Sequence, residues 1–280
     1  MRILVKVGGA QLEDPSARAE LVRSVALARA AGLEIVLLHG GGNQIRALVR
    51  RLGLPERYHE GLRVTDADTA EVVLMVLAGL VGKTLAAAFE ERGVRAASLC
   101  GADGSTFASV RERREGVDLG FVGAVDRVDP RLVEMLLAEG YVPILATVAP
   151  GEPADRASGA PSGSGPFHNV NADQAAGPIA RALGSQAVLF LTDVEGVLGA
   201  DGIRIAELSP ERCAELRAAG VLAGGMIPKV EAALAAIDLN PGALVKIAPA
   251  GGESSVLAAL DPEVGTRFTS QEKAWTSTSC

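Results

Sequence analysis

The sequence predicts an α/β fold in which helices cover a mainly parallel sheet. Short apolar runs, such as residues 3–7 and 35–38, alternate with longer Ala-rich segments that carry helix boundaries. This alternation is typical of parallel sheets with right-handed crossovers. The 280 residues include only six Phe, two Tyr and one Trp. The core must therefore consist of Ala, Val, Leu and Ile, which suits buried parallel strands.

Six segments are expected to form strands, because each is a short apolar run that ends in turn residues. In chain order they cover residues 3–7, 34–38, 94–100, 141–148, 187–192 and 243–248. The polar, turn-rich stretch 103–115 predicts a hairpin with an exposed charged strand. The acidic, glycine-rich loop after the fifth strand could hold a nucleotide or simply connect two elements.

Eight segments are expected to form helices around these strands. In chain order they cover residues 15–31, 43–52, 67–92 and 130–139, an Ala-rich stretch after Asp173, and residues 210–219, 228–237 and 254–260. Pro15 fits a first helical turn, and Thr65 or Asp66 can cap the long third helix. The Gly/Pro/Ser-rich loop 150–166 and the C-terminal residues 271–280 are expected to be flexible or disordered.

Composition and charge narrow the classes of function. A net charge of −7 and a pI of about 5.2 argue against a general nucleic-acid binder, which needs a basic face. Cys100, Cys213 and Cys280 are far apart and show no metal-ligand spacing, so a reducing cytoplasm is expected. The first strand starts at the N-terminus without a signal peptide, and no apolar run is expected to span a bilayer.

Two glycine-rich turns follow strands and are candidate anion sites. Gly8 and Gly9 follow the first strand, whereas Gly40, Gly41 and Gly42 follow the second and precede a helix. Glycine lets the backbone approach a ligand closely, and the N–H groups at a helix start attract anions. A plain strand–helix turn explains the same pattern, so this observation alone leaves both interpretations open.

Three cations lie near these turns or near a helix start. Lys6 interrupts an otherwise buried strand, so its ammonium either reaches water or points at a ligand beside the glycine turn; the glycines favour a ligand. Lys229 starts a helix, where the helix dipole disfavours a cation, and this hints at an anion nearby. Arg63 lies in a loop and is either a solvated charge or a bidentate partner for a carboxylate.

A cluster of polar residues precedes the Ala-rich helix of the second half. It consists of Asn169, Asn171 and Asp173. Asparagine and aspartate are good helix caps, but one cap explains only one of the three. The remaining polar groups indicate a ligand-facing cluster.

Six motifs occur in a fixed order along the chain. They are KVGGA (6–10), HGGGNQI (39–45), GLRVTD (61–66), NVNADQAA (169–176), LTDVEGVL (191–198) and GGMIPKV (224–230). Through them the chain resembles the amino acid kinase family, and within it the N-acetyl-L-glutamate kinases of arginine biosynthesis, over residues 3–268. The resemblance implies a three-layer αβα sandwich like that of carbamate kinase. It also implies an N-lobe (1–165) for the acyl amino acid and dimerisation, and a C-lobe (166–270) for ATP.

The resemblance further implies transfer of the γ-phosphoryl group of ATP to a side-chain carboxylate, which gives an acyl phosphate. Lys6 and Lys229 would stabilise the transferring group, and Asp173 would hold both lysines in place. Substrate contacts are implied for Gly41, Gly42, Arg63 and Asn169. Nucleotide contacts are implied for Gly8, Gly9, Asp193, Val194, Glu195, Gly196, Val197, Leu198, Val221, Leu222 and Ala223. Mg²⁺ is implied as the counter-ion of ATP, held mainly by phosphates, so no protein ligand is expected.

Several alternatives remain open at this stage. The acceptor could be a succinylated or carrier-linked glutamate, or an aminoadipate. A non-catalytic amino-acid sensor on the same fold is an alternative from a different class. The resemblance implies a small-molecule substrate, no nucleic-acid or membrane partner, a cytoplasmic location and a homodimer. Arginine-inhibited members carry a helix before the first strand, and this chain starts at the strand, so an arginine-insensitive homodimer is expected.

Overall fold

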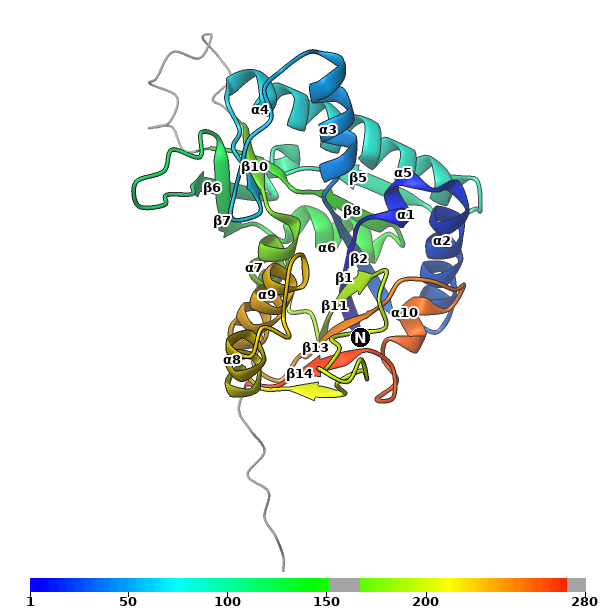
Figure 1. Ribbon diagram of the computed structural model, residues 1–280. Helices are drawn as coiled ribbons and strands as arrows, with labels where there is room; N and C mark the ends of the chain where they lie inside the picture. Colours follow the sequence, from blue (N-terminus) through cyan, green and yellow to red (C-terminus); the bar gives the residue numbers. More distant parts are fainter. Residues whose placement is uncertain (152–166, 271–280) are drawn as a thin grey trace, which may run out of the picture.

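A mainly parallel sheet forms the centre of the computed structural model, which describes residues 1–151 and 167–270 (Figure 1). Its eight strands are β1 (Arg2–Val7), β2 (Glu34–His39), β5 (Ala96–Leu99), β8 (Val142–Ala146), β11 (Ala187–Thr192), β12 (Glu207–Leu208), β13 (Leu244–Pro249) and β14 (Thr266–Phe268). They lie in the order β12-β14-β13-β11-β1-β2-β8-β5. The six strands from β13 to β5 are parallel, and β14 runs antiparallel to β13.

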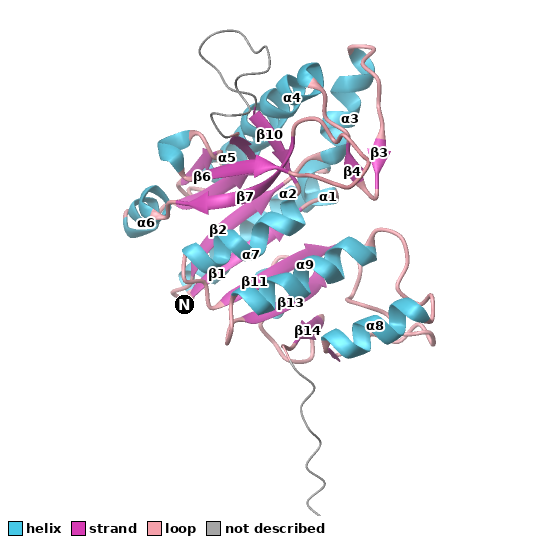
Figure 2. Ribbon diagram, turned by 90° about the vertical axis from the view of Figure 1, so that its left-hand side faces the viewer, coloured by secondary structure: helices cyan, strands magenta, loops and turns pink. Residues whose placement is uncertain are grey.

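Helices cover both faces of this sheet. Side chains alternate along β1, so that Ile3 and Val5 enter one core and Leu4 enters the other. The first core is covered by α2 (Pro15–Ala30), α3 (Gly42–Arg51), α4 (Ala67–Leu74), α5 (Gly82–Glu90) and α10 (Ser255–Ala258). The second is covered by α6 (Arg131–Ala138), α7 (Ala172–Ala182), α8 (Pro210–Ala218) and α9 (Met226–Leu239), with α7 and α9 lying across the central strands (Figure 2). The predicted three-layer αβα arrangement is confirmed.

The predicted long helix over 67–92 contains a π-helical segment, η1 (Met75–Val81), between α4 and α5. The run Ala67–Glu90 is long and apolar enough to cross a membrane, with a mean hydropathy of 2.1 over its most apolar window. The expectation that no apolar run could span a bilayer was therefore wrong. However, 44% of that window is buried inside the protein, and Leu85 and Phe89 belong to the first core. This run is a core helix of the sandwich.

A second, four-stranded sheet adjoins the central one. It consists of β6 (Phe107–Arg111), β7 (Val122–Val128), β10 (Phe167–Val170) and β9 (Val148–Pro150), in the order β6-β7-β10-β9. The hairpin expected within 103–115 is only partly right, because that stretch contributes β6 and the antiparallel partner strand β7 begins later, at Val122. The single strand expected over 141–148 was wrong, because the chain leaves the central sheet at Thr147. There the Thr147 N–H donates to the His39 carbonyl at 3.2 Å, and the Thr147 carbonyl accepts from Val170.

Two short elements complete the surroundings of the site. The helix α1 (Ala10–Glu13) follows the first strand directly, and the hairpin β3 (Tyr58–His59) and β4 (Leu62–Arg63) follows α3. The loop expected over 150–166 lies almost wholly outside the described residues, and the tail 271–280 lies entirely outside them. The strands β1, β2, β5 and β8 of the central sheet precede residue 151, as do α1 and the β3–β4 hairpin. The other strands of that sheet, β11 to β14, follow residue 167.

Candidate active site

The candidate site lies where three neighbouring parallel strands end. Val7 of β1 is in register with His39 of β2, and Lys6 is in register with Phe190 of β11. The Gly8–Gly9 turn therefore lies between the turn after β2 and the loop after β11. Carboxyl ends of strands in open α/β sheets are the usual place for ligands. A cleft of about 320 Å³ opens at this edge.

Eight of the eighteen predicted site residues line this cleft. They are Lys6, Gly8, Gly9, Gly41, Gly42, Arg63, Asn169 and Asp173. They come from β1 and the turn after it, the β2–α3 turn, the β3–β4 hairpin, β10 and the start of α7. These elements are far apart in the sequence, and the fold brings them together. Lys229 and the two predicted nucleotide segments, 193–198 and 221–223, are not among the residues that line it.

One buried carboxylate joins the two predicted lysines. The Lys6 Nζ lies 2.8 Å from Asp173 Oδ1, and the Lys229 Nζ lies 3.4 Å from Asp173 Oδ2. Lys6 is only 7% exposed. The helix carrying Lys229 begins at Met226, two residues earlier than predicted, and has no acidic residue in its first turn. The unfavourable position of Lys229 on the helix dipole is therefore compensated by Asp173 of another helix.

Close packing of α7 on α9 brings this carboxylate and Lys229 together. Gly177 lies at the helix contact, where an added Cβ would be 3.1 Å from the Cα of Ala236. The N-terminus of α7 is fixed by Asn171, whose side chain accepts hydrogen bonds from the backbone of Asp173 and Gln174. Asn171 thus acts as the helix cap, and its neighbours are left for other contacts.

Charge and burial shift both pKa values in this cluster. Burial lowers the pKa of Lys6 and the nearby Lys229 lowers it further, although the Asp173 carboxylate opposes both effects. Burial alone would raise the pKa of Asp173, but the two ammonium groups lower it. Asp173 is therefore ionised at neutral pH and holds two cations that repel each other. An anion placed between these cations would relieve that repulsion.

The glycine turns leave space and backbone donors beside these cations. Helix α3 begins at Gly42 without a side-chain cap, so its first N–H groups keep their capacity to bind an anion. At Gly41 an added Cβ would lie 2.7 Å from Leu77 Cδ2, so the Leu77 side chain would have to shift. At Gly8 an added Cβ would lie 3.5 Å from Lys6 Nζ and would occupy space next to the ammonium.

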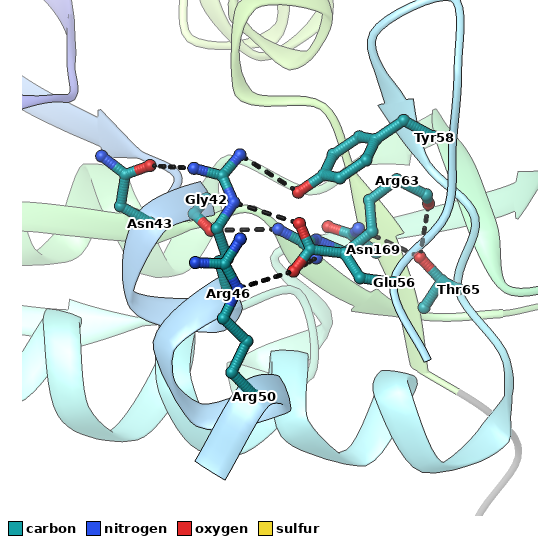
Figure 3. Close-up of polar contacts among 9 residues, drawn as sticks. All are labelled: Gly42, Asn43, Arg46, Arg50, Glu56, Tyr58, Arg63, Thr65 and Asn169. Carbon is teal, nitrogen blue, oxygen red and sulfur yellow. Dashed lines mark hydrogen bonds and ion pairs between the residues drawn. The ribbon is translucent and has the colours of Figure 1, made fainter. Parts of the chain in front are cut away.

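Arg63 is buried and lines the same cleft, and Figure 3 shows its polar contacts. Its Nη2 donates to the Gly42 carbonyl at 3.1 Å, and its guanidinium stacks on the Tyr58 ring at 4.7 Å. Its Nη1 lies 3.7 Å from Glu56 Oε2 and, among the described residues, has no hydrogen-bond partner. Arg63 therefore keeps an unused buried donor. Asn169 donates to Thr65 Oγ1 at 3.2 Å, and Thr65 in turn donates to the Arg63 carbonyl.

Sequence reasoning missed the polar cluster around Arg63. Arg46, Glu56 and Tyr58 surround its guanidinium (Figure 3). The charged and aromatic stretch PERYHE directly before the GLRVTD motif was the available signal, but it has no periodicity that would place it.

The apolar run 35–38 predicts only that a strand ends at His39, so the contacts of this residue were also missed. Its side chain is fully buried, and its Nδ1 donates to the Gly40 carbonyl at 2.8 Å. Burial lowers the pKa of His39 to about 4, so the imidazole is neutral at physiological pH. A neutral ring in this position fixes the first peptide of the glycine turn.

The two predicted nucleotide segments lie on the far side of the Gly8–Gly9 turn. Residues 193–198 follow β11, and residues 221–223 connect α8 to the helix of Lys229. Val197 has both backbone groups occupied: its N–H donates to Thr266 Oγ1 at 2.9 Å and its carbonyl accepts from Ile205. The Val197 and Leu222 side chains are buried in the second core, so the exposed members of the segments are left for a ligand.

Comparison with known proteins identifies the family of the chain. The model of the amino acid kinase family matches residues 1–245. The acetylglutamate kinase of Acidiphilium cryptum is 42% identical over 245 residues, which cover 84% of this chain and 78% of that protein. The acetylglutamate kinase of Parvibaculum lavamentivorans is 36% identical over 273 residues, covering 94% and 86%.

Solved structures share the fold over almost the whole chain. The crystal structure of smu.665 from Streptococcus mutans has a TM-score of 0.77 and 26% identity, with 96% of this chain and 99% of that chain covered. Carbamate kinase of Giardia has a TM-score of 0.65 at 17% identity, covering 95% and 98%, and supports the fold alone. From the family match and the relatives at 36% to 42% identity, we conclude that this chain belongs to the amino acid kinase family.

Proposed function

We propose that the protein uses ATP to phosphorylate the side-chain carboxylate of N-acetyl-L-glutamate, giving N-acetyl-L-glutamyl 5-phosphate in arginine biosynthesis. The observation that carries this proposal is the Lys6–Asp173–Lys229 cluster beside the Gly8 turn. Lys6 and Asp173 of this cluster line the cleft, which is also lined by a buried, partly unpaired Arg63. The name of the relatives supplies the acceptor. A cytoplasmic location is part of the proposal.

Phosphoryl transfer requires the protein to position the reactants and to compensate their charge, and it requires no covalent intermediate. Lys6 and Lys229 come from different elements and meet at one carboxylate, so both ammonium groups can face the transferring phosphoryl oxygens. The negative charge of that group raises the pKa of Lys6 again and keeps it protonated. The acceptor carboxylate is ionised at neutral pH, so the reaction needs no general base.

We assign the acceptor to the side of Arg63, with Gly41, Gly42 and Asn169, and the phosphates of ATP to Gly8 and Gly9. The nucleotide would extend over residues 193–198 and 221–223, so that residues 1–165 act as the acceptor lobe and 166–270 as the ATP lobe. Within the described residues, no group of three or more His, Cys, Asp or Glu is placed to hold a metal ion. We propose that Mg²⁺ is held mainly by the phosphates of ATP and by water, as is usual for Mg²⁺ in phosphoryl-transfer sites.

A hydroxamate assay for acyl phosphate tests this function. We expect ATP-dependent product with N-acetylglutamate, and much less with N-succinylglutamate, glutamate, aspartate or N-acetyl-aminoadipate. Binding of acetylglutamate without any acyl phosphate would favour the sensor alternative. Faster turnover of another acyl or carrier-linked acceptor would correct the substrate and keep the reaction type.

Replacing Arg63 by alanine should raise KM for N-acetylglutamate by about 10- to 100-fold, because a hydrogen bond to a charged partner is lost. The KM for ATP should change little, since Arg63 lies at the acceptor end of the cleft. Steady-state kinetics with each substrate varied in turn would measure both values. Equal increases in the two KM values would contradict the assignment of Arg63 to the acceptor.

We further propose that two copies of the chain associate through the exposed apolar side of the 67–90 helix. On this run, Met75 is 53% exposed and Leu80 is 60% exposed, although both are large apolar side chains. Light scattering should give the mass of a dimer, and a Met75→Glu/Leu80→Glu variant should shift it toward the monomer because charges would be buried in the contact. A monomeric wild-type protein would contradict this proposal.

A further inference from the structure

Three guanidinium groups converge on one carboxylate at the acceptor end of the cleft (Figure 3). Arg46 Nε lies 3.1 Å from Glu56 Oε1, whereas Arg63 Nη1 and Arg50 Nε lie 3.7 and 3.8 Å from Glu56 Oε2. One carboxylate cannot balance three cations, so the cluster keeps an excess of positive charge. This local excess occurs in a chain whose net charge is −7.

Two of these arginines face the cleft and the third does not. Arg46 and Arg63 are among the residues that line it, together with Tyr58, whereas Arg50 is not among them and is largely exposed. Arg46 and Arg63 also share the Tyr58 ring, with their guanidinium carbons 5.8 and 4.7 Å from its centroid. Glu56 bridges the two guanidiniums, which shows that they are close enough for one carboxylate to bind both.

The guanidinium of Arg46 is fixed before any ligand arrives. Its three nitrogens donate to Glu56 Oε1 at 3.1 Å, to Asn43 Oδ1 at 3.0 Å and to the Tyr58 hydroxyl at 3.3 Å. A guanidinium has five N–H donors, so two remain. A cation held by three partners loses little conformational freedom when it binds an anion. The buried Nη1 of Arg63 supplies a further unused donor.

We propose that Arg46 is a specificity-determining residue of the acceptor site. With Arg63 it forms a two-guanidinium subsite for the α-carboxylate of the acceptor, while the side-chain carboxylate points to the lysines. The enzyme would therefore select N-acylated amino acids that carry two carboxylates. This inference rests on the proposed function, because it assigns the acceptor to the side of Arg63. Planar, bidentate guanidinium–carboxylate pairing provides the selectivity.

The test compares two acceptors that differ only in this carboxylate. N-acetyl-L-glutamate carries it, and N-acetyl-isoglutamine has a neutral carboxamide in its place. Calorimetry without ATP gives the Kd of each ligand for the wild-type protein and for Arg46→Met, which keeps the length of the side chain. Arg50→Met is the matched control, since Arg50 contacts the same Glu56 from outside the cleft.

We expect Arg46→Met to weaken acetylglutamate binding by about 10- to 100-fold and to change isoglutamine-ligand binding by less than about threefold. The Kd of N-acetyl-isoglutamine divided by the Kd of N-acetyl-L-glutamate should therefore fall in Arg46→Met. Arg50→Met should keep the wild-type value of this ratio. Equal weakening of both ligands in Arg46→Met, or no weakening of either, would leave this ratio unchanged and would overturn the inference. Equal weakening would show that the role of Arg46 is merely structural.

Kinetics separates this inference from the proposed function. If the wild-type protein binds acetylglutamate with the expected Arg46 dependence but forms no acyl phosphate, the kinase activity fails and the subsite stands. If acyl phosphate forms and the Arg46→Met variant keeps the wild-type KM ratio for the two acceptors, the subsite fails and the activity stands.

Discussion

Replacement of Lys6 by methionine should lower kcat by about 10²- to 10³-fold, the usual loss when one preorganised charge is removed from a transition state. Lys6 lies beside the Gly8 turn and donates from a fixed position, 2.8 Å from Asp173. The acceptor and ATP also bind elsewhere in the site, so their KM values should change much less. The loss should therefore fall on the chemical step.

The fold should survive this substitution. Burial is the largest cause that lowers the pKa of Lys6 in the folded protein. Because the folded pKa lies below the unfolded value, the charged form of Lys6 lowers the free energy of unfolding. This cost is fully present at pH values below the folded pKa and disappears as pH rises toward the unfolded pKa. Methionine removes this cost and keeps the side-chain volume, but it leaves Asp173 with Lys229 as its remaining partner. We therefore expect a cooperative unfolding transition at a moderately lower Tm than that of the wild type.

Lys83→Met is the matched control for Lys6→Met. Lys83 is exposed on α5, away from the cleft, where it donates to the Ser98 carbonyl. Its replacement should leave kcat within about twofold, as for most surface substitutions. Single-turnover measurement of acyl phosphate would show whether chemistry or product release is slowed. A Lys6→Met enzyme with near-normal turnover would remove Lys6 from the catalytic assignment.

The parallel sheet was predictable because its strands carry the strongest local signal. The strand expected over 187–192 is β11 residue for residue, and the one expected over 3–7 is β1 without Arg2. Continuous apolar runs identify buried strands without any tertiary information. Several elements that were not predicted, such as α1, β3, β4 and β12, have only two to four residues, too few for a periodic pattern. The strand β7, with seven residues, was also missed.

Two departures have a tertiary cause. The chain switches from the central sheet to the second sheet at Thr147 because hydrogen bonds to His39 and Val170 divide an otherwise continuous apolar run. The η1 segment places Leu77 against Gly41, where an added Cβ would lie 2.7 Å from Leu77 Cδ2. Neither partner is near in sequence, so local patterns cannot predict these contacts.

The candidate site was predictable to a different extent at its two ends. Lys6 and Lys229 stood out because each is in a place that local physics disfavours, and the structure brings both to Asp173. By contrast, Arg46 and Glu56 look like ordinary surface charges of a helix and a loop. Their role depends on the hairpin that folds back over α3, and a contact of this kind exists only in three dimensions.

Replacement of Asp173 by asparagine should lower both stability and activity. The substitution keeps the shape of the side chain but leaves two ammonium groups without their shared counter-charge. Breaking a buried ion pair by removing one partner costs about 3–5 kcal/mol, and Lys6 and Asp173 are only 9% and 13% exposed at their side chains. Because Lys229 is 25% exposed and keeps some hydration, we expect a loss near the lower end, about 3 kcal/mol. Urea unfolding at neutral pH would measure it.

The stability difference should depend on pH in a defined direction. The folded pKa of Asp173 is lowered, although burial opposes this, because Lys6 and Lys229 attract the carboxylate. Its stabilising contribution is therefore present above the unfolded pKa, which is about 3.9, and is lost as pH falls through the folded pKa. The wild type and Asp173→Asn should converge in stability in acid. Asp238→Asn, at an exposed position of α9, should follow the wild type at every pH.

The activity of Asp173→Asn should respond to pH as well. The negative charge of Asp173 is the main effect that raises the pKa of Lys6 and so opposes burial. Without that charge, Lys6 loses its proton at a lower pH. The basic limb of the kcat/KM profile should therefore shift toward lower pH, and kcat at neutral pH should fall by about 10²-fold or more. A merely structural aspartate would lower the amount of folded enzyme and leave this limb in place. An unshifted limb would therefore show that Asp173 does not control the charge of Lys6.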